Sequence, residues 1–170
     1  MKDKINLADI TIRTELIPGD IGHITYLHGY LYQKEYNYGI NFEAYVAKGL
    51  AEFWEHYDQS MDRVWVCEHD HNIVGFLLLM HRETAAQLRY FILDPGYRGI
   101  GLGKKLMGLY MDFLKKNRYT HSYLWTTKEL FAAAHLYTSH GFTLAEEKES
   151  EAFGKKVTEQ RYDLVLDYEL

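Results

Sequence analysis

The residues best suited to chemistry lie in one glycine-rich stretch that reads Arg98-Gly99-Ile100-Gly101-Leu102-Gly103. An apolar run ends just before it, at Asp94-Pro95, and a helical pattern starts directly after it. Glycines let the backbone come close to a ligand, and the first N–H groups of a helix have no partner inside the helix. The helix dipole adds about half a positive charge at that end. The stretch therefore predicts an anion site, and we interpret the anion as a diphosphate.

Two common diphosphate motifs do not fit this stretch. A Walker-type loop needs a glycine five positions before its Gly-Lys pair and Ser or Thr after it, but the chain has Arg98 and Lys105 there. A dinucleotide fingerprint needs glycine at its sixth position, which here is Lys104 or Leu106 depending on the starting glycine. A nucleotide-binding α/β domain is therefore the less favoured alternative.

The elements that must position the glycine-rich stretch follow from the periodicity of the apolar residues. The pattern predicts strands at residues 11–16, 63–68, 73–81, 88–93, 122–125, 142–147 and 157–166. It predicts helices at residues 21–33, 42–56, 101–117 and 128–140. The step from strand 88–93 through helix 101–117 to strand 122–125 requires a parallel, right-handed crossover. The other strands should pair largely antiparallel, so the fold class is α+β (mixed α/β).

Composition narrows the class of protein. The 170 residues suit one domain, 1–170, and the formal charge of −5 gives no reason to expect a nucleic acid or an anionic membrane as partner. Cys67 is the one cysteine, which excludes an intrachain disulfide and fits a cytoplasmic protein. The longest apolar run, residues 73–80, is too short to span a bilayer, and the N-terminus lacks a signal-peptide core. His69-Asp70-His71 reads as a hairpin tip, so no metal is expected.

The spacing Arg98-x-x-Gly101-x-Gly103 resembles the diphosphate motif of the GNAT superfamily of N-acetyltransferases. Residues 136–142 (LYTSHGF) are similar to that family's Leu-Tyr-x-x-x-Gly-Phe helix end, and the element order matches over nearly the whole chain. The resemblance implies the GNAT fold, a mostly antiparallel twisted sheet of about seven strands with one parallel crossover and four flanking helices. It also implies acetyl-CoA as cosubstrate, and direct acetyl transfer to a primary amine of a small molecule, protein or peptide.

A narrower resemblance lies in the first half of the chain. Residues 26–36 (YLHGYLYQKEY) and 42–47 (FEAYVA) are similar to the acetyltransferase half of bacterial proteins that fuse a MarR-type regulator to a GNAT domain. Phe153-Gly154 fits the same group. Because the chain has no room for a winged-helix half, we expect a stand-alone acetyltransferase that does not bind DNA.

The resemblance implies a set of cofactor contacts. The glycine-rich turn would hold the diphosphate of acetyl-CoA through backbone N–H groups, and the end of strand 88–93 would pair through its backbone with the pantetheine arm. Many family members have an asparagine near this arm, but the candidate positions here carry Thr126 and Thr127. The expected cofactor-binding residues are Ile92, Leu93, Arg98, Gly99, Gly101, Gly103, Lys104 and Thr127.

The resemblance also implies catalytic roles. Tyr137 matches the tyrosine that protonates the departing CoA thiolate, and a phenol is a suitable donor to a thiolate. Some relatives place a glutamate base on the strand before the glycine turn, but this strand offers Gln87, Arg89 and Tyr90. Glu35 is the first candidate for the base, because its region forms one wall of the acceptor pocket in the family.

The sequence leaves open which group is the general base and which amine is the acceptor. A water relay is as good a base as Glu35, and His28 and Glu52 are weaker candidates. A group of tyrosines suggests a pocket for an apolar or cationic acceptor: Tyr26, Tyr30, Tyr32, Tyr36 and Tyr38. The second hypothesis is a module that binds acyl-CoA as a sensor or scaffold without turnover. The sequence leaves open whether the chain acts alone or as a homodimer.

Overall fold

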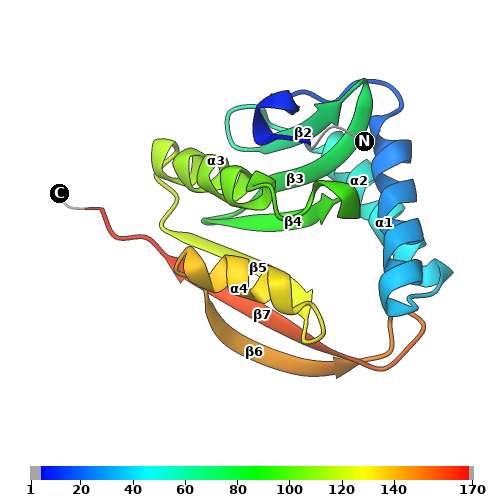
Figure 1. Cartoon of the computed structure of the whole chain (residues 1–170). Helices are drawn as coiled ribbons and strands as arrows, with labels where there is room; N and C mark the ends of the chain where they lie inside the picture. Colours follow the sequence, from blue (N-terminus) through cyan, green and yellow to red (C-terminus); the bar gives the residue numbers. More distant parts are fainter. Residues whose placement is uncertain (1–4, 169–170) are drawn as a thin grey trace.

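The fold is a seven-stranded sheet in the order β1-β2-β3-β4-β5-β7-β6, with helices on both faces (Figure 1). A computed structural model describes residues 5–168. The strands are β1 (Thr11–Arg13), β2 (Arg63–His69), β3 (Asn72–Arg82), β4 (Ala85–Leu93), β5 (His121–Thr127), β6 (Thr143–Ser150) and β7 (Val157–Val165). The helices are α1 (Asp20–Tyr36), α2 (Ile40–Glu55), α3 (Leu102–Lys116) and α4 (Phe131–Ser139).

The predicted order of helices and strands is confirmed, and so is the predicted parallel pair, which is β4 with β5. The other paired strands are antiparallel. Several predicted boundaries are wrong: β1 ends at Arg13, β4 already begins at Ala85, α4 begins only at Phe131, and α1 continues past residue 33 to Tyr36. Asn37 then ends the helix in a left-handed conformation with φ of 60°. Glu35 consequently lies in the last turn of α1 and not in a connection between helices.

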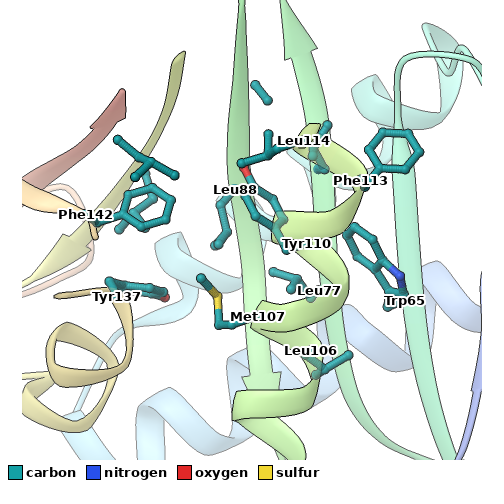
Figure 2. Packing of buried hydrophobic residues seen from close by; sticks show 14 of the residues in the cluster. Trp65, Leu77, Leu88, Leu106, Met107, Tyr110, Phe113, Leu114, Tyr137 and Phe142 are labelled. Carbon is teal, nitrogen blue, oxygen red and sulfur yellow. The ribbon is translucent and has the colours of Figure 1, made fainter. Parts of the chain in front are cut away.

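Two apolar clusters, one on each face of the sheet, hold the helices in place. The central strand β3 is apolar on both faces, so Leu77 and Leu79 pack toward α3 while Phe76 and Leu78 pack toward α1 and α2. Figure 2 shows how α3 lays a stripe of residues onto the strands, with Tyr137 and Phe142 beside it. The helices are therefore fixed against the same strands that carry the predicted site.

The structure also bears on the predictions for Cys67 and for the turn at Asp70 and His71. Cys67 is fully buried, and burial raises the pKa of its thiol to about 12, so it is a core residue. Asp70 and His71 form a tight turn with positive φ between β2 and β3, as predicted. Within residues 5–168, no helix is long and apolar enough to cross a membrane, and no three His, Cys, Asp or Glu side chains are grouped for a metal ion.

Candidate active site

The parallel strands β4 and β5 separate halfway along their length. They are paired at Ala86 with Ser122, at Gln87 with Tyr123 and at Leu88 with Leu124. Beyond that point β4 runs on to Leu93 and β5 to Thr127 without pairing to each other. Residues 89–93 therefore have no strand partner on the side that faces β5, while Arg89, Ile92 and Leu93 stay paired with β3 on the other side.

A bulge in β4 accompanies the separation. The register between β3 and β4 shifts between Phe76 and Leu78, and Tyr90 has a φ of 53°, which is unusual for a non-glycine residue. A bulge bends a strand and increases its twist, and this one lies directly after the last β4–β5 pair. The strand thus turns away from β5 at the place where the predicted pantetheine site begins.

The glycine-rich stretch lies at the far end of this opening. Gly99 and Gly101 have φ of 78° and 90°, a conformation that only glycine adopts without strain. Gly101 is the residue before α3, so the first N–H groups of that helix have no partner within it. Gly103 allows a close approach between helices, because a Cβ there would lie 3.3 Å from the side chain of Leu136 of α4. The turn therefore has the geometry of an anion site.

One cavity of about 540 Å³ joins the opening, the glycine-rich turn and the helices. All the residues predicted to bind the cofactor line it: Ile92, Leu93, Arg98, Gly99, Gly101, Gly103, Lys104 and Thr127. The two predicted catalytic residues, Tyr137 and Glu35, line it as well. Residues from 35 to 137 are thus brought to one place.

Tyr137 lies in the last turns of α4, with its ring near those of Phe91, Phe142 and Tyr162. The side chain is 5% exposed, and burial raises the pKa of its phenol. Among the described residues, none forms a hydrogen bond with its hydroxyl group. The phenol is therefore protonated at neutral pH and available to a ligand in the cavity.

Thr127 connects the cofactor side of the cavity to the opposite wall. Its side chain is buried, and its Oγ1 lies 2.9 Å from the hydroxyl of Tyr38 in a hydrogen bond. Lys155 reinforces the connection, because its Nζ donates to the Tyr36 carbonyl at 2.6 Å and to Glu129 at 3.0 Å. The end of β5, the α1–α2 connection and the β6–β7 loop are therefore held together.

The β6–β7 loop completes an aromatic wall. Phe153 stacks on Tyr38 with ring centroids 5.6 Å apart, and its carbonyl accepts a hydrogen bond from the Gly39 N–H at 2.9 Å. The residues of this aromatic wall all line the cavity: Tyr32, Tyr36, Tyr38, Phe42, Tyr45 and Phe153. The prediction of a tyrosine-rich pocket was too broad, because Tyr26 and Tyr30 are exposed and stack on each other instead.

Glu35 is paired with Arg98. The guanidinium nitrogens Nη1 and Nη2 each donate to one carboxylate oxygen at 2.8 Å, and Nε donates to the Leu93 carbonyl at 3.3 Å. Hydrogen bonding to Arg98 holds the pKa of Glu35 below its ordinary value. The pair makes Glu35 a weaker base than a free carboxylate, and it ties the glycine-rich turn to α1.

His28 reaches the cavity from α1 and is 3% exposed. Its Nδ1 lies 2.8 Å from the Ile24 carbonyl, which accepts a hydrogen bond and so places the proton on Nδ1. Burial lowers the pKa of His28 to about 4, and the imidazole is therefore neutral at pH 7. Glu52, the other weaker candidate for the base, is an exposed residue of α2 that faces Lys48.

Arg89 and Phe153 are cavity residues for which the sequence predicted no role. Arg89 follows the last β4–β5 pair, and Phe153 is brought in by the β6–β7 loop. The sequence placed Arg89 on the strand before the glycine turn, but only as a residue found where some relatives have a glutamate. Phe153 was part of the resemblance to MarR–GNAT proteins. No local sequence signal predicts that its ring centroid lies 5.2 Å from that of Phe42.

Several solved structures of acetyltransferases share the fold of this chain. An acetyltransferase of the GNAT family from Staphylococcus aureus Mu50 has a TM-score of 0.76 at 22% identity, over 93% of this chain and 99% of that chain. A Salmonella typhimurium acetyltransferase structure with its cofactor acetyl-CoA has a TM-score of 0.73 at 18% identity, over 95% and 96%. Spermidine N-acetyltransferase from Vibrio cholerae, in complex with CoA and spermine, has a TM-score of 0.68 at 22% identity, over 93% and 96%.

The family assignment rests on the sequence itself. No curated protein matches the chain. The family model described as acetyltransferase (GNAT) family matches residues 29–142, which is more than half of the chain and includes the glycine-rich turn, the separated strands and Tyr137. The chain therefore belongs to the GNAT family of acetyltransferases.

Proposed function

We propose that this chain transfers the acetyl group of acetyl-CoA to a primary amine. The observation that carries the proposal is the free edge of β4, which runs within one cavity from the glycine-rich turn to the neighbourhood of Tyr137. The diphosphate binds the N–H groups at the start of α3, and the pantetheine arm pairs with residues 92 and 93 as an added strand would. The solved relatives that hold acetyl-CoA or CoA support this choice of cosubstrate.

The reaction needs no covalent enzyme intermediate. The neutral amine attacks the acetyl carbonyl carbon, an N–C bond forms, the C–S bond breaks and its electron pair stays on the CoA sulfur. The Tyr137 hydroxyl gives its proton to that thiolate, and the proton lost by the amine returns to Tyr137 through water. Burial raises the proton affinity of both the thiolate and the phenol, so the return of the amine proton to Tyr137 leaves neither group charged in the cavity. Positioning of the two reactants supplies much of the rate.

The roles of the charged residues follow from their partners. Glu35 holds Arg98 beside the glycine-rich turn, and Lys104 is free to approach a phosphate. Because Glu35 is engaged in this pair, we assign removal of the amine proton to water. The likeness to the acetyltransferase half of MarR–GNAT proteins is also a proposal, supported by the way Phe153 packs against Tyr38 and Phe42.

Thiol release from acetyl-CoA tests the proposal. The purified chain is mixed with acetyl-CoA and separately with aliphatic amines, polyamines, amino acids and peptides with free N-termini. We expect at least one class of amine to accelerate thiol release and to appear in acetylated form by mass spectrometry. Tight binding of acetyl-CoA without acceleration by any amine would favour the alternative of a silent acyl-CoA-binding module. Absence of acetyl-CoA binding would contradict both.

A further inference from the structure

Arg89 is the feature of the cavity that acetyl transfer itself does not use. It follows the last β4–β5 pair, and Nη2 of its guanidinium donates to the Tyr45 hydroxyl at 2.8 Å. The guanidinium carbon lies 4.6 Å from the ring centroid of Tyr90 and 5.5 Å from that of Tyr45. Gly49 of α2 makes room for this packing, since a Cβ there would overlap the Tyr90 hydroxyl and would lie 3.2 Å from Nη2. The side chain is thus held against the acceptor side of the cavity.

The charges of the cavity leave Arg89 without an anionic partner. The lysine and arginine residues that line it are Arg89, Arg98 and Lys104. Arg98 is paired with Glu35, and Lys104 belongs to the turn that receives the diphosphate. Arg89 forms no salt bridge with any carboxylate of residues 5–168. A guanidinium has five N–H donors, so most of its donors remain available to a ligand.

The carboxylates of the cavity are occupied instead. Glu35 faces Arg98, and Glu159 has the Nζ of Lys148 at 3.9 Å. A polyamine would need a free carboxylate for its second ammonium group and would meet the positive charge of Arg89. The aromatic wall, which Arg89 contacts at Tyr45, suits an apolar or aromatic body. The charge pattern therefore favours an acceptor that carries a negatively charged group.

We propose that the acceptor is an amine that carries a carboxylate, as an amino acid with an apolar or aromatic side chain does, and that Arg89 binds this carboxylate. The inference rests on the proposed acetyl transfer and deepens it. Arginine binds carboxylates through two parallel hydrogen bonds, and such charge-assisted bonds are stronger than neutral ones. In this arrangement the carboxylate sits over Arg89, the side chain meets the aromatic wall and the amine is directed toward the thioester.

Matched acceptor pairs test the inference. Phenylalanine and 2-phenylethylamine, and tyrosine and tyramine, differ only by the carboxylate, and spermidine serves as a carboxylate-free polyamine. For the wild type we expect kcat/KM to be at least tenfold higher for the amino acid of a pair. Arg89→Gln should remove that preference by lowering the value for the amino acid tenfold or more, while the value for its partner stays within about twofold. Arg118→Gln, at the end of α3, removes the same charge elsewhere and should change neither.

Binding without turnover supplies an independent measurement. Phenylacetate, which has the ring and the carboxylate but no amine, should raise the melting temperature of the CoA-loaded wild type and of Arg118→Gln, but not that of Arg89→Gln. A faster reaction with spermidine or 2-phenylethylamine than with any amino acid would overturn the inference while leaving acetyl transfer intact. Equal stabilisation of wild type and Arg89→Gln by phenylacetate would overturn it too. Failure of acetyl transfer itself is recognised separately, by absent thiol release with every acceptor.

Discussion

Glu35 and Arg98 form a two-point ion pair, with both nitrogen–oxygen distances 2.8 Å, although 63 residues separate them in the sequence. The pair joins the C-terminal part of α1, which carries Tyr32 and Tyr36 of the aromatic wall, to the turn that precedes α3. A charged pair of this kind, partly exposed to solvent, contributes about 1 kcal/mol or less to stability. In the proposed function its consequence is larger, because the aromatic wall and the proposed diphosphate site share this contact.

Replacement of Glu35 separates the two roles considered for it. If Glu35 only positions Arg98, Glu35→Gln should raise KM for acetyl-CoA severalfold and lower kcat less than tenfold. A base would behave differently, since its loss costs about 10²- to 10⁴-fold in kcat. Steady-state kinetics with both substrates measure the difference. Glu55→Gln, an exposed change at the end of α2, is the control for loss of a negative charge.

Tyr137→Phe should lower kcat about 100-fold, because the thiolate then leaves without a proton donor. KM for acetyl-CoA should change little, since the ring and its packing remain. Burial raises the pKa of the phenol, so kcat of the wild type should not fall until the pH exceeds the ordinary range for tyrosine. Tyr162→Phe, a change in a neighbouring buried ring outside the cavity, should keep wild-type kcat. Equal kcat for Tyr137→Phe and wild type would remove Tyr137 from the mechanism.

The glycine-rich turn could be predicted because its signal is local, and Tyr137 was singled out because residues 136–142 resemble a GNAT motif. Gly101 ends a strand-to-helix turn where positive φ is needed, and Tyr137 lies one turn before a helix-ending glycine. The Glu35–Arg98 pair and the hydrogen bond from Tyr38 to Thr127, which spans 89 residues, depend on how distant elements pack. The bulge at Tyr90 also escaped prediction, because tertiary packing imposes a φ of 53° that tyrosine does not favour locally.

His28 should make stability depend on pH. Its pKa is about 4 in the folded chain and about 6.5 when unfolded, so below pH 6.5 the unfolded chain binds a proton that the folded chain does not. This contribution destabilises the fold progressively as pH falls from 6.5 to 4, by up to about 3 kcal/mol. In His28→Leu it is absent, so urea unfolding at pH 7, 5.5 and 4.5 should show the variant gaining relative to wild type. A constant difference at all three pH values would contradict the assignment.

Gly154→Ala should loosen the aromatic wall. Gly154 has a φ of 87°, and a Cβ there would lie 3.2 Å from the backbone of Gly39, so the β6–β7 loop must move. The strain costs about 1–2 kcal/mol, and displacement of Phe153 should raise KM for the amine more than KM for acetyl-CoA. Gly22→Ala is the control: its Cβ meets open space in α1, so the change should stabilise the chain by about 0.5–1 kcal/mol with unchanged kinetics. Unchanged amine KM in Gly154→Ala would argue against an acceptor role for this wall.

Calorimetric titration of acetyl-CoA into three forms of the protein tests the central claim, that the turn before α3 holds the cosubstrate. Gly101→Glu places a carboxylate where the diphosphate should bind and forces a side chain onto a φ of 90°. Gly108→Glu adds the same charge within α3, where a Cβ meets open space. We expect binding by wild type and Gly108→Glu, and at least a tenfold loss of affinity in Gly101→Glu, whose folding is checked by circular dichroism. Equal affinity in all three forms would contradict the claim.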